Sequence, residues 1–120
     1  VRGSERILVI EDDIGVRKFI NKILTTQGYE VHEAGTIAEA AHILSEHRDM
    51  NLVISDIVLP ESNGFEIQKY IHNSENILFM SGYDMGEVEE YGSLQDKEFL
   101  EKPFTSQDLL KRVRRMCDAV

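Results

Sequence analysis

The sequence predicts an α/β fold in which helices cover both faces of a doubly wound, five-stranded parallel sheet. Short apolar runs alternate five times with helix-like patterns along the 120 residues, and right-handed crossovers leave few other arrangements for such an alternation. The run Leu52-Val53-Ile54 contains no polar residue, as in a strand buried on both faces of a parallel sheet. The length and the hydrophobic content of 42% fit a single domain.

The first half of the chain contains two clear strand and helix units. Residues 6–10 form a β-branched run, and apolar residues at helical spacing follow until Gly28, which favours a helix end: Val16, Phe19, Ile20, Ile23 and Leu24. Residues 29–34 alternate like a half-covered strand. Thr36 and Glu39 then form a capping box ahead of a second helix, whose apolar residues are Ile37, Ala40, Ala41 and Leu44.

The second half repeats the alternation less regularly. Turn residues at 60–64 precede a helix expected from about Phe65, and residues 77–80 repeat the pattern of a buried strand. Residues 84–91 contain a glycine and four acidic residues, so we expect a short or mobile helix that ends at residues 92–93. Residues 97–101 form the fifth strand. A capping box then opens the final helix, which has Thr105 and Asp108 as caps and Leu109, Leu110, Val113 and Met116 as buried residues.

Composition and charge exclude several kinds of partner. The formal charge of −9 disfavours nucleic acid, whose binding depends on clustered Lys and Arg, and we expect the one basic run, residues 111–115, to be a solvated helix face. The longest apolar stretches are about five residues, too short to span a membrane, and no leader opens the chain. We therefore expect a soluble, cytoplasmic protein in which the single cysteine, Cys117, is a small apolar residue of the last helix.

Polar residues follow four of the predicted strands, at the edge where parallel sheets bind ligands. They are Glu11-Asp12-Asp13, Ser55-Asp56, Ser81-Gly82 and Glu101-Lys102-Pro103. If these strands are neighbours, several carboxylates, a hydroxyl and an ammonium group meet in one cleft. Crowded carboxylates raise one another's pKa unless a cation lies among them. Mg²⁺, which keeps several waters, suits this set, whereas Ca²⁺ is disfavoured because EF-hand spacing is absent.

Asp56 can serve both as a metal ligand and as a nucleophile. An aspartate that attacks phosphorus forms an acyl phosphate, a reaction in which the protein mainly positions groups and neutralises charge. Mg²⁺, Lys102 and the Ser81 hydroxyl would share that neutralisation. Each of these features is common by itself in solvated turns and loops, and it is their joint occurrence at four strand ends that favours a phosphoryl-accepting site.

Four motifs together resemble the receiver domain of response regulators. They are I-L-V-I-E-D-D, I-S-D-I-V-L-P-E-S-N-G, I-L-F-M-S-G-Y and F-L-E-K-P-F, in this order and with family-like spacing. The resemblance covers residues 6–116, and we expect the receiver domain to span residues 6–118, with residues 1–5 as a tail or linker remnant. It implies a flavodoxin-like (βα)₅ fold with strand order 2-1-3-4-5.

The resemblance also implies a metal site and a phosphoacceptor. Asp56 would accept the phosphoryl group. Mg²⁺ would be bound directly by Asp12, through water by Glu11, and by Asp56 and the backbone carbonyl of Val58. The helix that follows contains an apolar residue and then a basic residue, and these match the family's positions when the acidic pair is Glu11 and Asp12. Asp13 would then be an accessory acidic neighbour or a helix cap.

A conformational switch is implied as well. Lys102 would pair with the phosphoryl group and precede a cis peptide bond to Pro103, the Ser81 hydroxyl would move onto the phosphoryl oxygens, and Phe99 would turn inward. The face formed by residues 84–91, residues 97–101 and the final helix would then change and support homodimers. The donor would be a phosphohistidine on a histidine kinase or a histidine phosphotransfer domain, so that the domain catalyses only its own phosphorylation and dephosphorylation.

Three residues differ from the commonest family pattern. Glu11 replaces the commoner aspartate, Ser81 the commoner threonine and Phe99 the commoner tyrosine. Because all three variants occur in the family, we expect them to adjust the function of the site and not to abolish it. We expect Val58 and Tyr83 to hinder an attacking water and to prolong the phosphorylated state. By family analogy the donor would dock on the first helix near Ile14, Gly15, Lys18 and Asn21.

Two other classes of protein are alternatives. A haloacid-dehalogenase-type phosphatase also uses an aspartate and Mg²⁺, but its nucleophile is the first residue of an Asp-x-Asp motif after strand one, where this chain has Glu11. A scaffolding pseudo-receiver would lack Asp12, Asp56 or Lys102, and all three are present. We expect either a stand-alone receiver or one excised from a larger protein. The M-S-G-Y and K-P-F segments resemble receivers attached to hybrid histidine kinases.

Overall fold

The computed structural model describes residues 4–59, 62–71, 76–82 and 98–118. At its centre is a parallel sheet with the order β2-β1-β3-β4-β5, which confirms the predicted strand order. Strand β1 pairs with β2 on one side and with β3 on the other, so the order of the strands reverses at β1. The strands are β1 (Arg6–Ile10), β2 (Glu30–Ala34), β3 (Leu52–Asp56), β4 (Ile77–Ser81) and β5 (Glu98–Glu101).

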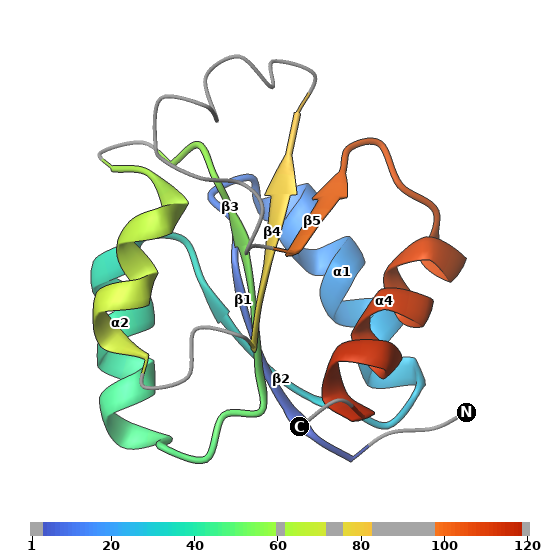
Figure 1. Ribbon diagram of the computed structural model, residues 1–120, viewed down its shortest axis with the longest axis horizontal. Helices are drawn as coiled ribbons and strands as arrows, with labels where there is room; N and C mark the ends of the chain where they lie inside the picture. The colour runs from blue at the N-terminus through green and yellow to red at the C-terminus, as the bar shows by residue number, and fades with distance from the viewer. Residues whose placement is uncertain (1–3, 60–61, 72–75, 83–97, 119–120) are drawn as a thin grey trace.

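Helices cover both faces of the sheet (Figure 1). One face carries α1 (Ile14–Thr26) and α4 (Ser106–Asp118), and the other carries α2 (Ile37–Glu46) and the 3₁₀ helix η1 (Gly64–Tyr70). Successive side chains of a strand point to opposite faces. Accordingly Ile7 and Val9 of β1 belong to the core beneath α1 and α4, whereas its Leu8 and Ile10 belong to the core beneath α2 and η1.

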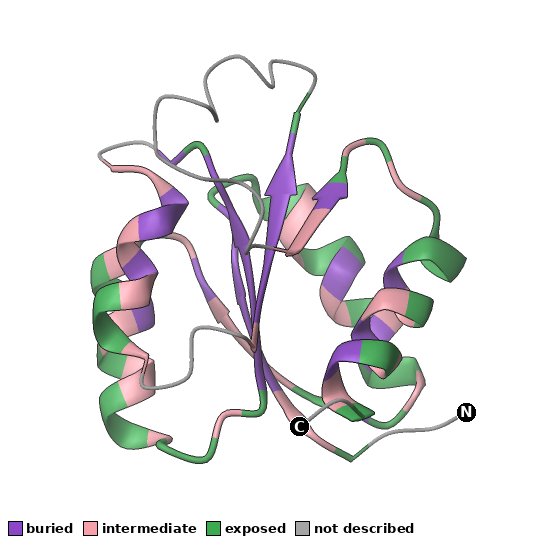
Figure 2. Ribbon diagram, in the orientation of Figure 1, coloured by how far each residue is buried: buried purple, intermediate pink, exposed green. Residues whose placement is uncertain are grey.

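Burial follows the position of each strand in the sheet (Figure 2). Every residue of the inner strands β3 and β4 is buried, while β2 and β5 at the edges are partly exposed. The unbroken apolar run at the start of β3 is therefore explained, as predicted, by helices on both faces.

The predicted capping residues begin three of the helices. The Asp13 side chain accepts a hydrogen bond at 3.1 Å from a backbone N–H three residues on and caps α1. Thr36 caps α2 by accepting from the N–H of Glu39 at 3.1 Å. At α4, Asp108 donates its N–H to the Thr105 hydroxyl at 3.0 Å and accepts from the Thr105 N–H at 3.2 Å. These short-range contacts are formed as the sequence predicted.

The basic run at residues 111–115 is only partly solvated, which corrects the prediction for it. Arg112 donates to the carbonyl oxygen of Phe99 at 2.6 Å, and Arg114 forms an ion pair with Glu5. Both arginine side chains are less than one-third exposed. The reason is that one side of α4 faces β5 and the chain before β1, where the long stems can pack while their charged ends find partners.

Two further predictions concern the second half of the chain. The helix expected from Phe65 begins one residue earlier and has 3₁₀ geometry. The predicted helix at residues 84–91 and the beginning of the fifth strand at Lys97 lie outside the described residues. Within the described part of the chain, the helices are too short or too polar to cross a membrane.

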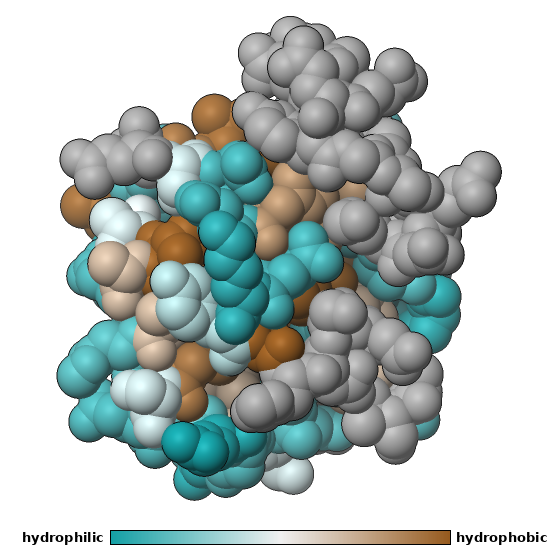
Figure 3. Space-filling model, turned by 60° about the vertical axis from the view of Figure 1, so that its left-hand side comes forward, coloured by the Kyte–Doolittle hydropathy of each residue, from teal (hydrophilic) through white to brown (hydrophobic). Residues whose placement is uncertain are grey.

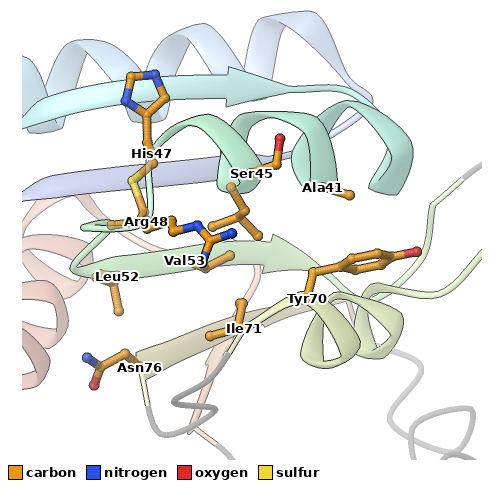
Figure 4. Close-up of a pocket in the computed structure, with 11 residues that line it drawn as sticks. Ala41, Ser45, His47, Arg48, Leu52, Val53, Tyr70, Ile71 and Asn76 are labelled. Carbon is orange, nitrogen blue, oxygen red and sulfur yellow. The ribbon is translucent and has the colours of Figure 1, made fainter.

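The face covered by α2 and η1 mixes polar and apolar side chains (Figure 3). A cavity opens there between the end of α2 and the start of β3 (Figure 4). Leu52 and Ile71 contribute apolar surface to it, and His47 and Arg48 contribute polar groups. Because Leu52 begins β3 and Asp56 ends it, this cavity is separate from the cluster of polar residues at the other end of the sheet.

Candidate functional site

The sheet brings the predicted polar strand ends to a single edge. Neighbouring strands are parallel and end within one residue of each other in the register, since Ile10 lies beside Ser55, Asp56 beside Met80 and Ser81 beside Glu101. The residues that end or follow these strands therefore form one row: Glu11, Asp56, Ser81 and Lys102. The predicted convergence of carboxylates and ammonium group is observed at the point where the strand order reverses, and Ser81 ends the strand next to Asp56.

Lys102 links the two most buried carboxylates of the cluster. Its Nζ lies 2.8 Å from Glu11 Oε1 and 3.0 Å from Asp56 Oδ2. The exposed fractions of the side chains are 1% for Glu11, 12% for Asp56 and 27% for Lys102. The backbone N–H of Lys102 donates to the Ser81 carbonyl oxygen at 2.7 Å, and the peptide bond to Pro103 is cis, as predicted. One ammonium group is thus held between two buried carboxylates.

The electrostatics of this trio centre on Glu11. Burial raises the pKa of the Glu11 carboxyl to about 7; the contact with Lys102 only partly opposes this rise, and the neighbouring Asp56 carboxylate adds to it. Burial acts to lower the pKa of Lys102, but its contacts with Glu11 and Asp56 outweigh burial and raise it. The cluster therefore carries more negative charge than one ammonium group neutralises, and it would gain from an added cation.

The acidic residues are close enough together to bind one ion. One carboxylate oxygen from each of Glu11, Asp12 and Asp56 lies within 4.8 Å of the other two. The exposed Asp12 lies on the same cleft as Val58 and Lys102. Oxygen ligands with one side open to water are the set that Mg²⁺ takes. The carboxylate oxygens of these three residues therefore suit a magnesium ion as ligands.

Two further residues of the predicted site lie on the same cleft. Asp13 lines it while its side chain caps α1, so of its two predicted roles the helix cap is formed. Val58 donates its backbone N–H to Asp56 Oδ1 at 3.3 Å, and its apolar side chain is 61% exposed. With Lys102 on Oδ2, both carboxylate oxygens of Asp56 have a partner.

The two residues of the predicted switch lie on neighbouring strands. Ser81 ends β4 and is only 3% exposed, and its hydroxyl has no hydrogen-bond partner among the residues that the structure describes. The ring of Phe99 on β5 is half-buried, with its centroid 5.9 Å from that of Phe79 and 6.4 Å from that of Phe65. Ser81 therefore has unused hydrogen-bonding capacity at the end of the strand next to the one that carries Asp56. Tyr83 lies outside the described residues.

Sequence reasoning missed two residues that support the site. Gly64 begins η1, and a Cβ at this position would overlap the backbone carbonyl oxygen of Asp56. Arg17 on α1 donates to the backbone carbonyl oxygen of Glu11 and to the carboxylate of Glu33. The available signals were a glycine that ends a turn-rich segment and a basic residue near the start of a helix, and neither reveals which group the residue contacts.

Comparison with known proteins identifies the family. Residues 7–114 match the response regulator receiver domain. The aerobic respiration control protein ArcA of Escherichia coli K12 is 36% identical over 117 residues, which cover 94% of this chain and 48% of ArcA. The response regulator receiver protein CpdR of Brucella abortus (strain 2308) is 32% identical over 116 residues, which cover 93% of this chain and 96% of CpdR. The chain belongs to the response regulator receiver domain family, and the predicted resemblance is confirmed.

A solved structure agrees with this assignment. The receiver domain of the hybrid histidine kinase CckA matches with a TM-score of 0.78 and 31% identity over 93% of this chain and 98% of that domain. The chain is accordingly a phosphoacceptor receiver domain of a two-component phosphorelay, in a family whose members generally bind Mg²⁺. It spans about half the length of ArcA, the first of these relatives.

Proposed function

We propose that Asp56 accepts the phosphoryl group from a phosphohistidine, with Mg²⁺ held by Glu11, Asp12, Asp56 and the backbone carbonyl of Val58. The observation that carries this proposal is the position of Lys102 Nζ, in contact with both Glu11 Oε1 and Asp56 Oδ2. A carboxylate at the end of a central strand is thereby placed on an open cleft beside a positive charge. This is the arrangement that phosphoryl transfer to an aspartate requires.

The proposed reaction transfers the phosphoryl group from an imidazole nitrogen to a carboxylate oxygen of Asp56. A carboxylate oxygen of Asp56 attacks phosphorus, the bond from phosphorus to the imidazole nitrogen breaks, and that nitrogen keeps the electron pair and takes up a proton. Lys102 and the Ser81 hydroxyl donate hydrogen bonds to the transferred oxygens and neutralise their charge. Bound Mg²⁺ supplies further neutralisation at the same oxygens.

We also propose the switch that the family pattern implies. The buried Ser81 hydroxyl lacks a partner among the described residues, so a phosphoryl oxygen would satisfy it. Movement of Ser81 toward that oxygen would leave space beside β5, and the ring of Phe99 would turn into this space. The ring at present contacts Phe79 and Phe65. The surface of β5, α4 and residues 84–91 would change as a result, and this surface is our proposed site of homodimerisation.

The donor is proposed to be a histidine kinase or a histidine phosphotransfer domain that docks beside the cleft. Ile14 and Val58, which are 64% and 61% exposed, are large apolar side chains next to the acidic residues. Exposed apolar side chains of this kind favour contact with another protein. The docking surface would include Gly15, Lys18 and Asn21 of α1, although Lys18 and Asn21 also contact Glu33.

Several broader expectations remain part of the proposal. We expect the receiver domain to span residues 6–118, after a tail or linker remnant at residues 1–5, and to be cytoplasmic. It would bind neither nucleic acid nor membrane itself and would catalyse only its own phosphorylation and dephosphorylation. Attachment to a hybrid histidine kinase is supported by the similarity to the CckA receiver domain.

Exposure to a small phosphodonor, followed by intact mass measurement, tests the proposal. The wild type should gain one phosphoryl group in the presence of Mg²⁺ and none after chelation. Asp56→Asn should gain none, whereas the matched variant Asp13→Asn, which changes a neighbouring carboxylate, should still gain it. An undiminished adduct on Asp56→Asn would contradict the assignment of the acceptor.

The lifetime of the adduct tests the proposed shielding. Val58 and Tyr83 would obstruct the approach of water to the phosphoryl group, so Tyr83→Ala should shorten the half-life of the phosphorylated protein. A half-life that this substitution leaves unchanged would show that Tyr83 has no such role.

A further inference from the structure

A polar network lies behind the acidic turn, and Arg17 is at its centre. Arg17 Nε donates to Glu33 Oε1 at 2.9 Å, and Arg17 Nη1 donates to the backbone carbonyl oxygen of Glu11, also at 2.9 Å. The side chains of Arg17 and Glu33 are each only 18% exposed. The guanidinium therefore joins the end of β2 to the turn that follows β1, through two charge-assisted hydrogen bonds shielded from water.

Helix geometry explains why Arg17 and its neighbour differ. Side chains of a helix lean toward its N-terminus, so Arg17, the fourth residue of α1, reaches back over the preceding turn. Lys18 is 63% exposed and contacts the other oxygen of Glu33, Oε2, at 3.0 Å. Gly35 leaves room for the guanidinium, since a Cβ there would lie 3.0 Å from Arg17 Nη1.

The network holds the backbone of Glu11 from both sides. The Glu11 N–H donates to the carbonyl oxygen of Ala34 at 3.0 Å, and its carbonyl oxygen accepts from Arg17. A peptide unit is planar, so the direction of the Glu11 carbonyl also sets the orientation of the Asp12 nitrogen and Cα. The Asp12 carboxylate itself has no hydrogen bond or ion pair with any described residue. The backbone therefore sets where the Asp12 Cα and Cβ lie, and thus where the carboxylate can reach.

We infer that Arg17 is a positioning residue for the metal ligand Asp12. By holding the plane of the peptide between Glu11 and Asp12, the guanidinium directs the Asp12 carboxylate to the place where its oxygen lies within 4.8 Å of oxygens from Glu11 and Asp56. Glu33 anchors the guanidinium from β2. This inference rests on the proposed magnesium site.

Positioning and simple charge predict opposite effects on metal binding. Arg17 and Lys18 each carry one positive charge near the cluster, so loss of either would strengthen Mg²⁺ binding if only Coulomb repulsion mattered. Residues that orient metal ligands from behind contribute about tenfold or more to affinity. Loss of Arg17 should therefore weaken Mg²⁺ binding about tenfold, whereas loss of Lys18 should leave it unchanged or slightly tighter.

The test compares Arg17→Met with the matched control Lys18→Met, using calorimetric titration with Mg²⁺ alone. Arg17→Lys is the second variant, because it keeps the charge and the fold but cannot bridge Glu33 and the Glu11 carbonyl; we expect it also to weaken binding. In the metal-free proteins, amide hydrogen exchange at residues 12–13 should accelerate in both Arg17 variants and stay unchanged in Lys18→Met. Urea unfolding reports any general loss of stability.

The outcomes separate the two hypotheses. Equal dissociation constants for wild type and Arg17→Met would overturn the positioning role while leaving the magnesium site intact. Equal weakening by Arg17→Met and Lys18→Met would also overturn it, since each variant removes one contact to Glu33 but only Arg17→Met removes the contact to the Glu11 carbonyl. A wild type that fails to bind Mg²⁺ would overturn the proposed site and this inference with it.

Discussion

The two turns that carry the acidic residues are held in place by different kinds of contact. In the turn between β1 and α1, charged side chains hold Glu11: Lys102 contacts its carboxylate and Arg17 contacts its backbone carbonyl. The turn between β3 and η1 is held by a hydrogen bond within the backbone, which the Gly64 N–H donates to the Ile57 carbonyl oxygen at 2.6 Å. The first turn should therefore respond to pH and to changes of charge, and the second to added bulk.

The largest effect is expected in the second turn. Gly64→Ala would place a methyl group on the carbonyl oxygen of Asp56, and because that contact is with backbone the turn must shift. We expect a loss of about 3 kcal/mol in the free energy of unfolding, measured by urea denaturation. The matched control is Gly82→Ala, where an added Cβ has no atom within 4 Å. Equal stabilities of the two variants would contradict the close contact at Gly64.

The next effect concerns the charge of Glu11. Its pKa of about 7 in the folded state lies above the value of 4.5 for a free carboxyl, so the folded chain binds this proton more tightly than the unfolded chain. Stability from Glu11 is thus present at low pH and is lost as pH rises from about 4.5 to about 7. Glu11→Gln stays neutral and should exceed the metal-free wild type in stability at pH 8, by on the order of 2 kcal/mol.

Urea denaturation at pH 5 and pH 8, with chelator present, measures this difference. Glu5, Glu30, Glu33 and Asp49 have lowered pKa values, so they titrate below the window. Asp12→Asn is the control, because it removes an exposed carboxylate and leaves Glu11 in place. If wild type and Glu11→Gln lose stability equally between the two pH values, the raised pKa of Glu11 is wrong.

Magnesium should stabilise the first turn by mass action. A ligand at ten times its dissociation constant stabilises the folded state by about 1.4 kcal/mol, and Mg²⁺ should do so for the wild type when followed by thermal denaturation. The effect should be smaller at pH 5, where Glu11 is protonated. Asp12→Asn, which lacks one ligand oxygen, should show little stabilisation at the same concentration. Similar stabilisation of both proteins would indicate that the ion binds elsewhere.

The smallest effect is expected from the helix cap within the first turn. Asp13→Ala removes the side chain that accepts from the Val16 N–H at 3.1 Å, and loss of such a cap costs about 1 kcal/mol. Asp12→Ala, one residue earlier, removes an exposed side chain that makes no such bond, and should change metal-free stability much less. Urea denaturation of both variants decides between them, and a larger loss for Asp12→Ala would refute the assigned cap.

The parts of the fold that depend on local sequence were predictable. Alternating apolar runs, buried strand cores and capping pairs such as Thr105 and Asp108 depend on residues close together in the chain. The edge of the sheet where Asp56 and Lys102 meet followed from the rule for parallel strands, and the assignment of roles to individual residues came from the family resemblance.

The parts that depend on distant contacts were not predictable. Arg17 contacts Glu33, 16 residues away, and Arg114 contacts Glu5, 109 residues away, so the basic run that looked solvated is partly buried. The raised pKa of Glu11 follows from burial, which sequence alone does not give. The 3₁₀ geometry of η1 likewise differs from an α-helix by a hydrogen-bond register that apolar spacing does not distinguish.

The most direct test of the central claim is to locate the phosphoryl group chemically. After treatment with a phosphodonor and Mg²⁺, borohydride reduces an aspartyl phosphate to the corresponding alcohol, and peptide mass mapping identifies the altered residue. The account predicts modification at Asp56 alone, at the end of β3 and beside Lys102. Modification at Asp12 or Asp13 instead, or none in the presence of Mg²⁺, would contradict it.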